Sequence, residues 1–202
     1  MPGRKFTKRQ IALLRKEAQE QYDNMRGARF YRNADFLLYL LSVILIALSI
    51  RTFLAEPVRV DGSSMYPTLL SGEHMFVEKV TYWDQAPQRG DIIICYYPGY
   101  RESCVKRVIG LPGERLEIRA GQVYINGGLL DESSYFAGGM LTSDGIWAIG
   151  ERELFVMGDN RNGSKDSRAD SVGPIPYDQV VGKVRAVIWP IGNRRWMERT
   201  VY

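Results

Sequence analysis

The chain has 202 residues, of which 45% are hydrophobic and 25% are charged, and its formal net charge is +4. This composition excludes a disordered chain, and the length allows one well-buried domain with accessory segments. The charge is uneven, because nine of the 27 Lys and Arg residues but only three of the 23 Asp and Glu residues lie in residues 1–33.

The basic tail, residues 1–33, is typical of binding either to nucleic acid or to the cytoplasmic face of a membrane. Its composition also predicts a helix, because apolar residues recur at spacings of three and four. These residues are Ile11, Leu14, Ala18, Tyr22 and Met25.

A long apolar run follows the tail and decides between these two partners. Residues 36–50, FLLYLLSVILIALSI, carry no charge. The apolar residues beyond Arg51 extend the run to about 20, the length that a helix needs to cross a hydrocarbon core of ~30 Å. The small residues Ala47 and Ser49 would allow a cleaved signal peptide, but a leader of more than thirty residues is much longer than usual.

We therefore expect a retained transmembrane helix at residues 34–55. The positive-inside rule then predicts a cytoplasmic tail and an extracytoplasmic domain at residues 56–202. The phospholipid bilayer is the expected partner of the N-terminal part, and nucleic acid is not.

Beyond the anchor, short apolar segments alternate with turns rich in Gly, Pro, Asn and Asp. This spacing predicts a mostly β domain, an antiparallel barrel or sandwich. Residues 133–152, rich in Gly and Ser, predict a small loop-rich surface excursion. The candidate strands are PVRV, HMFVEKV, DIIICYY, CVKRVIG, ERLEIRAGQVYIN, ELFVMGD and KVRAVIWPI.

The two cysteines flank a predicted hairpin turn. If the turn centres on Gly99 and Tyr100, Cys95 lies opposite Cys104 on the neighbouring strand. A disulfide and two free thiols both remain open. Two cysteines and one histidine cannot provide the usual four ligands of a zinc site, so we expect no metal.

The segment DGSSMYPTL contains a candidate nucleophile, Ser64. Serine needs a base, which is usually histidine. The single histidine, His74, lies on a predicted strand, where a packed or exposed histidine is the ordinary interpretation. A lysine can serve instead if burial lowers its pKa.

Strand alternation leaves two lysines open as the base. Lys106 shares its strand face with Cys104 and Val108, and Lys79 also has apolar neighbours on its own face. We expect the remaining domain lysines, Lys165 and Lys183, to be solvated.

A third segment, GDNRNGSKDSR at residues 158–168, has many hydrogen-bond donors and acceptors directly after an apolar strand. Such density predicts a loop that is held by its own hydrogen bonds and ion pairs beside a site.

Together these segments resemble the bacterial type I signal peptidase (leader peptidase) family of membrane-bound serine endopeptidases. GSSMYPTL resembles the family's serine box, VKRVIGLPGE its lysine box, and GDNRNGSKDSR its third box, and they follow an anchor in the family's order. The resemblance covers about residues 36–196 and implies removal of signal peptides from exported preproteins.

By this resemblance, Ser64 is the nucleophile and Lys106 is the general base. Ser164 matches the serine that orients the lysine, and Asp166 and Arg168 match residues that support the site. The resemblance implies no cofactor.

The resemblance also bears on the loop and the oxyanion hole. Asp159 and Arg161 are expected to hold the third segment. The family's oxyanion hole uses the backbone N–H of the nucleophile, and some members add a serine hydroxyl two residues earlier, where this chain has Gly62. A second donor is therefore left open.

The expected substrate is an extended chain that pairs with EPVRVDG and SCVKR as an added strand. Family pockets accept small side chains at the first and third positions before the cut, and Val58, Val60 and Val105 are the candidates to line them. Ordinary barrel core is the alternative for these valines. Trp189 and Trp196 are candidates for resting on the bilayer.

Two other functions are alternatives. Self-cleaving repressors share the Ser/Lys chemistry but are soluble, so the anchor argues against them. A catalytically inactive, membrane-tethered scaffold would have lost the serine or the lysine, and both are present.

Overall fold

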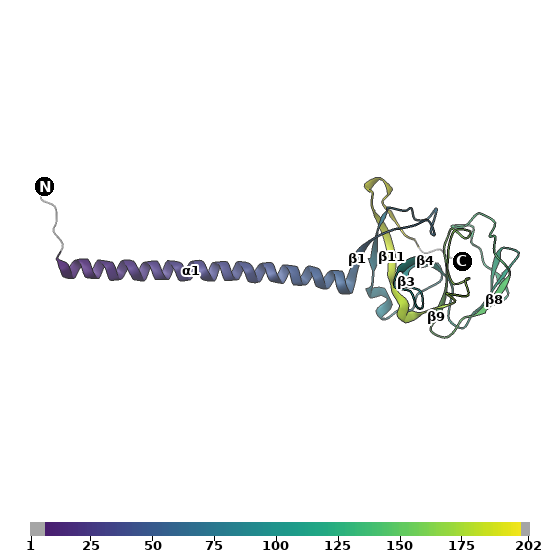
Figure 1. Cartoon of the computed structure of the whole chain (residues 1–202), viewed down its shortest axis with the longest axis horizontal. Helices are drawn as coiled ribbons and strands as arrows, with labels where there is room; N and C mark the ends of the chain where they lie inside the picture. The colour runs from purple at the N-terminus through teal and green to yellow at the C-terminus, as the bar shows by residue number, and fades with distance from the viewer. Residues whose placement is uncertain (1–6, 199–202) are drawn as a thin grey trace. The chain divides into compact units, whose positions relative to one another are not determined.

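The structure is a computed structural model that describes residues 7–198, and the chain divides after Ser49 into two compact units. The first unit is one continuous helix, α1 (Lys8–Ser49) (Figure 1). The expected boundary between tail and anchor at residue 33 does not interrupt this helix.

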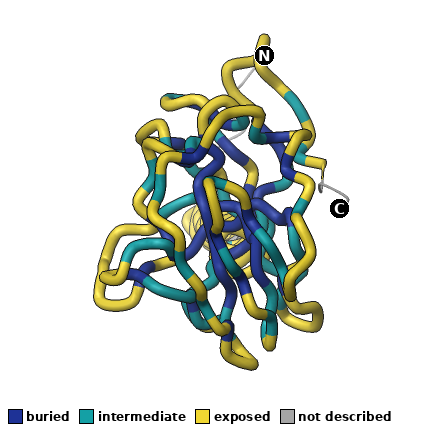
Figure 2. The backbone as a smooth tube through the Cα atoms, turned by 90° about the vertical axis from the view of Figure 1, so that its right-hand side faces the viewer, coloured by how far each residue is buried: buried dark blue, intermediate teal, exposed yellow. Residues whose placement is uncertain are grey.

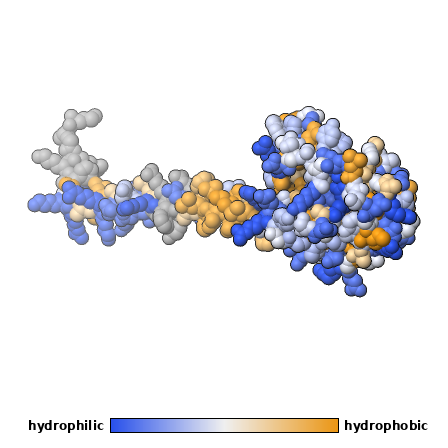
Figure 3. Space-filling view, turned by 45° about the vertical axis from the view of Figure 1, so that its right-hand side comes forward, coloured by the Kyte–Doolittle hydropathy of each residue, from blue (hydrophilic) through white to orange (hydrophobic). Residues whose placement is uncertain are grey.

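Residues Asn33–Leu54 are long and apolar enough to cross a membrane. Figure 3 shows the apolar stretch of α1 as a continuous hydrophobic band. These 22 residues overlap the predicted anchor at residues 34–55. The π-helical segment η1 (Ile50–Leu54) then leads into the first strand.

The larger of two sheets contains eight strands in the order β1-β2-β11-β3-β4-β9-β10, with β12 paired to β11. Every neighbouring pair is antiparallel, as the sequence predicted. The strands are β1 (Ala55–Arg59), β2 (His74–Glu78), β3 (Ile92–Tyr96), β4 (Ser103–Gly110), β9 (Glu153–Met157), β10 (Ile175–Pro176), β11 (Val180–Trp189) and β12 (Arg195–Trp196). Short 3-10 helices lie at η2 (Val80–Trp83), η3 (Tyr177–Gln179) and η4 (Ile191–Asn193).

The second sheet has the order β7-β6-β5-β8 and is also antiparallel. The segment ERLEIRAGQVYIN forms a hairpin here and not one strand, because Ala120 and Gly121 both have positive φ, as a tight two-residue turn requires. The strands are β5 (Arg115–Arg119), β6 (Gln122–Ile125), β7 (Gly128–Leu129) and β8 (Gly145–Ala148).

The Gly/Ser-rich stretch 133–152 contributes more than surface loop. It contains β8, and its Tyr135, Met140 and Ile149 are buried in the core of the second sheet. Single-sequence patterning missed this because the apolar residues are separated by exposed glycines and polar side chains.

The period of two along β3 places side chains in two different cores. Ile92 and Ile94 join one cluster, and Ile93 and Cys95 join another. Figure 2 shows buried segments along the strands and exposed residues at the loops that connect them. The structure thus confirms a mostly antiparallel β fold.

The β3–β4 hairpin has the predicted register, with Cys95 opposite Cys104. Both cysteines are free, and their sulfur atoms lie 3.6 Å apart. The sequence left open a disulfide or two free thiols, and the structure has two free thiols.

Strand β1 and the first half of strand β4 each have one edge that no other strand pairs with in the described part of the chain. In the described chain, β1 pairs only with β2. Residues 103–106 of β4 pair with β3 alone, because the pairing of β4 with β9 begins at Arg107. Backbone groups on these edges are available to another extended chain.

Candidate active site

The structure brings Ser64 and Lys106 together although they lie 42 residues apart. Ser64 lies in the turn between β1 and β2, and Lys106 lies on β4. Lys106 Nζ is 2.8 Å from Ser64 Oγ and 2.9 Å from the Val105 carbonyl oxygen. A nucleophile and a base need this hydrogen-bond distance.

Lys106 is only 3% exposed. Its pKa is lowered, because burial disfavours the charged ammonium. Negative charge on Cys104 and Asp166 acts in the opposite direction and moderates the decrease in the pKa. The net effect favours the neutral amine, the form that can accept a proton from serine.

The other candidate bases lie in different surroundings. Lys79 is in an ion pair with Glu56, with Nζ 3.4 Å from the carboxylate, so the structure separates it from the role that alternation left open. His74 lies on β2 and is half-buried.

The expectation for the two remaining lysines is half right. Lys165 is exposed, as predicted, and donates to the Tyr100 hydroxyl at 2.6 Å. The prediction that Lys183 is solvated is wrong, because its Nζ lies 2.6 Å from the carboxylate of buried Asp91. Asp91 precedes β3 and is distant in sequence, so the strand pattern around Lys183 could not reveal this partner.

The loop at 158–168 holds the turn of Ser64 by backbone contacts. The Asn160 N–H donates to the Ser64 carbonyl at 3.0 Å, and the Asn160 side-chain amide donates to the Ser63 carbonyl at 3.1 Å. A Cβ on Gly158 would lie 2.4 Å from the Ser64 carbonyl oxygen, so only glycine permits this approach. Sequence reasoning assigned neither residue a role, since such backbone contacts leave no side-chain pattern.

Asp166 and Arg168, the predicted supporting residues, pair with each other in the 158–168 loop. The buried Asp166 carboxylate accepts from the Gly158 N–H at 2.9 Å and pairs with Arg168 at 2.7 Å. Ser164 Oγ lies against Gly158, where an added Cβ would come within 2.3 Å. Its described hydrogen bond goes to the Lys165 carbonyl at 3.4 Å, and none joins it to Lys106 among the bonds that the described residues show.

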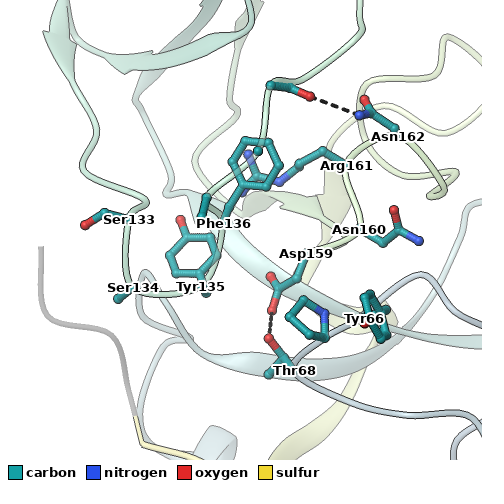
Figure 4. Close-up of a pocket in the computed structure, with 14 residues that line it drawn as sticks. Tyr66, Thr68, Ser133, Ser134, Tyr135, Phe136, Asp159, Asn160, Arg161 and Asn162 are labelled. Atoms are coloured by element: carbon teal, nitrogen blue, oxygen red, sulfur yellow. Dashed lines mark hydrogen bonds between the residues drawn. The ribbon is translucent and has the colours of Figure 1, made fainter.

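Three residues, one from each motif, form an interaction that we call the motif clamp: Thr68, Arg107 and Asp159. Arg107 donates to Asp159 through two nitrogens, at 2.8 and 2.7 Å, and the Thr68 hydroxyl donates to the same carboxylate at 2.5 Å. Figure 4 shows the Thr68–Asp159 bond, with Tyr135 nearby. The clamp fixes the neighbours of Ser64 and Lys106 relative to each other.

Arg161 supports the same loop from its interior, which agrees with the prediction that it holds the segment. Its guanidinium donates to the Gly158 carbonyl at 3.0 Å and to both carboxylate oxygens of buried Glu132. Glu132 lies just outside the excursion expected at 133–152, and sequence reasoning missed it.

We expect Arg107→Met to lower the free energy of unfolding by about 3–5 kcal/mol, because Asp159 would remain buried without its bidentate partner. Thermal unfolding of the wild type and the Arg107→Met variant in detergent measures the effect. Arg115→Met is the control, because exposed ion pairs contribute only about 0–1 kcal/mol. Equal melting temperatures for the two variants would contradict a structural role for the clamp.

A cleft of about 250 Å³ opens beside Ser64 between β1 and β4. All three predicted valines, Val58, Val60 and Val105, line it. They also pack in or against the neighbouring core cluster, so the barrel-core interpretation describes the same side chains. Gly62 lines the cleft as well and has φ +95°, a conformation in which a serine would be strained.

A larger hollow of about 620 Å³ has a different lining, drawn in Figure 4. It lies over Tyr66 to Thr68 and residues 159–162, and neither Ser64 nor Lys106 lines it. Among residues 7–198, no group of three His, Cys, Asp or Glu side chains could hold a metal ion.

Comparison with known proteins identifies a matching family. The family model described as "Signal peptidase, peptidase S26" matches residues 33–189, which include all three motifs. The family match defines the chain as a serine endopeptidase, and its N-terminal helix is compatible with a membrane anchor.

Curated relatives cover most of the chain. Signal peptidase I T of Bacillus subtilis (strain 168) is 40% identical over 161 residues, 75% of this chain and 83% of that protein. Signal peptidase I of Bacillus licheniformis is 35% identical over 186 residues, 88% of this chain and 97% of that protein. The crystal structure of a signal peptidase I from Enterococcus faecalis V583 is 35% identical and covers 49% of this chain and 97% of that chain, with a TM-score of 0.44. The chain belongs to the signal peptidase, peptidase S26, family.

Proposed function

We propose that the chain cleaves N-terminal signal peptides from exported preproteins, with Ser64 as nucleophile and Lys106 as general base. Family membership supports signal-peptide cleavage as the activity. The observation that carries the mechanism is the 2.8 Å distance between Lys106 Nζ and Ser64 Oγ, at a lysine that is almost completely buried.

In the proposed reaction, neutral Lys106 takes the proton of Ser64 as Oγ attacks the scissile carbonyl. The resulting ammonium protonates the leaving amine, and an ester joins Ser64 to the signal peptide. The regenerated amine then activates a water molecule, which hydrolyses the ester and frees the serine. Each step uses only these two side chains and the substrate.

The developing oxyanion needs donors beside Ser64. We assign the backbone N–H of Ser64 to this role, as the family resemblance implies, and the bond from the Asn160 N–H to the Ser64 carbonyl helps to fix the backbone there. Gly62 has a positive φ, which glycine adopts without strain and which would strain a serine at this position. Backbone donors are therefore the proposed oxyanion hole.

The substrate binds as an added strand in the cleft between β1 and β4. Both strands have unpaired edges there, so an extended peptide can form main-chain hydrogen bonds with them. A cleft of about 250 Å³ lined by valines suits small side chains. This supports cleavage after a small-x-small motif, with small residues at the first and third positions before the cut.

The proposed location is the bacterial cytoplasmic membrane, crossed once. The excess of Lys and Arg in residues 1–33 favours a cytoplasmic tail, and the catalytic domain then lies on the extracytoplasmic side. Trp189 and Trp196 are 54% and 77% exposed, and such indoles favour the membrane–water interface. Their contact with the bilayer would place the cleft near a substrate that is itself membrane-bound.

Mapping of the cleavage products tests this function. The full-length protein in detergent is expected to cut a reporter preprotein with alanine at the first and third positions, giving one new N-terminus at that site by mass spectrometry. A matched reporter with phenylalanine at both positions should remain intact, because the proposed valine-lined pockets accept only small side chains. Equal cleavage of both reporters would contradict the proposed specificity.

Activity is expected to fall on acidification, with a midpoint well below the usual pKa of lysine, about 10.4. Burial lowers the pKa of Lys106, so the neutral base persists at lower pH than for a solvated lysine and is lost once the pH falls through that lowered pKa. The pH dependence of kcat/KM on the reporter measures it. A profile controlled by a base that titrates near 10 would contradict the burial argument.

A further inference from the structure

Cys104 occupies an unusual place beside the proposed base. It lies two residues before Lys106 on the same face of β4, and it lines the cleft that contains Ser64. Cys95 is directly opposite on β3 and fully buried, and the two sulfur atoms are 3.6 Å apart. Directly opposed residues of antiparallel strands have Cα atoms about 4.5–5.5 Å apart, a spacing that a disulfide can bridge.

We propose that Cys104 and Cys95 form a thiol–disulfide site in the wall of the substrate cleft, which reacts with low-molecular-weight disulfides and thereby tunes Lys106. Cys104 is the attacking thiol, and Cys95 is the resolving thiol. The effect on Lys106 rests on the proposed function, whereas the thiol chemistry does not.

The two thiols differ in the way this chemistry requires. A hydrogen bond from Cys95, with a smaller contribution from Tyr97, lowers the pKa of Cys104 to about 7 despite its partial burial. The pKa of Cys95 is raised by the same hydrogen bond and by burial. Cys104 therefore supplies a thiolate near neutral pH at a residue that lines the cleft, while its sulfur packs against Cys95.

The reaction balances with one small disulfide, RSSR, as the oxidant. The Cys104 thiolate attacks one sulfur, the S–S bond of RSSR breaks, and RS⁻ leaves and takes a proton. Cys95 then loses its proton and attacks the Cys104 sulfur, which expels the second thiol. Two protein thiols are oxidised to one disulfide, and RSSR is reduced to two RSH.

Oxidation removes a negative charge from the surroundings of Lys106. Cys104 is the leading contributor that raises the pKa of Lys106, while burial lowers it. Without the thiolate, burial acts with less opposition, so the amine stays neutral to lower pH. The charged or titratable groups around Lys106 are Cys104 on β4, Cys95 on β3, and Asp159 and Asp166 on the 158–168 loop.

Thiol counting tests the site without any cleavage assay, because the chain has only these two cysteines. Reduced full-length protein in detergent is treated with oxidised glutathione, quenched in acid, and analysed by intact mass after maleimide labelling. Wild type is expected to lose both free thiols, carry no glutathione and yield a linked Cys95–Cys104 peptide pair. Cys95→Ser is expected to retain glutathione on Cys104.

Two free thiols in treated wild type, or a persistent glutathione adduct in place of the disulfide, would overturn the site. In Cys104→Ser, Cys95 is expected to remain free, because it is buried and hard to ionise. Modification of Cys95 in that variant as fast as Cys104 reacts in Cys95→Ser would overturn the assignment of attacker and resolver.

Cleavage of the reporter preprotein tests the coupling to Lys106. The acid limb of the pH profile is expected to lie at lower pH for oxidised than for reduced wild type, and the profile of Cys104→Ser should not respond to oxidised glutathione. Cys95→Ser should lose cleavage with oxidised glutathione, because the adduct fills the cleft, and regain it with dithiothreitol.

An acid limb that does not move on oxidation would overturn the coupling, even with the disulfide formed. Failure of the proposed function has a different signature, cleavage that survives Ser64→Ala, and the thiol count is independent of it.

Discussion

Replacement of Ser64 by alanine is expected to reduce kcat on a reporter preprotein by about 10³-fold or more. The change removes Oγ, the only atom of this side chain that can attack the scissile carbonyl, and leaves the backbone N–H of the proposed oxyanion hole in place. Binding should persist, since the valines and strand edges of the cleft are unchanged. Single-turnover cleavage measures the loss, and binding of a labelled signal peptide measures what remains.

The adjacent serine provides a matched control. Ser63 is exposed, and its carbonyl, which Asn160 holds, is retained in Ser63→Ala. This variant should cleave within a few-fold of wild type. Equal loss in the two variants would show that the turn, and not the Ser64 hydroxyl, is what the reaction needs.

Lys106→Met is expected to abolish cleavage to a similar degree, because a thioether cannot accept the serine proton. Methionine fills the same volume as the lysine stem without a buried amine, so thermal stability should be unchanged or higher. This opposite response of activity and stability distinguishes a base from a structural lysine. Reporter cleavage and thermal unfolding of the same preparation measure both.

Lys79→Met is the control for this substitution. Lys79 forms an ion pair with Glu56 and has no hydrogen bond to Ser64 among those that the described residues show. Its replacement should leave cleavage almost unchanged. Cleavage retained by Lys106→Met, or lost equally in Lys79→Met, would contradict the assignment of the base.

Strand periodicity predicted most of the large sheet and the register of its hairpin. The alternation of β3 and β4 is local, and one turn placed Cys95 against Cys104. The sequence alone did not choose between Lys79 and Lys106, because both have apolar neighbours. Their environments differ through contacts with segments far away in the chain, Glu56 for one and Ser64 for the other.

The supporting shell of the site was the hardest part to foresee. The Asn160 side chain donates to a carbonyl group almost a hundred residues earlier in the chain. Glu132, which pairs with Arg161, directly precedes the segment that was predicted to be a surface loop. Polar residues of this kind carry no periodicity, so their partners emerge only from the tertiary fold. Gly158 is similar, because its importance lies in an absent side chain.

The buried ion pairs around the site affect how its stability changes with temperature. Arg107–Asp159, Arg161–Glu132 and Arg168–Asp166 all join side chains that are less than a tenth exposed. The desolvation penalty of such pairs decreases as temperature rises, because hydration of charged groups becomes less favourable. Warming therefore weakens these ion pairs around Ser64 less than it would weaken hydrogen bonds between uncharged side chains. Heating should loosen the N-terminal and edge segments of this domain before it disturbs the spacing of the two reacting side chains.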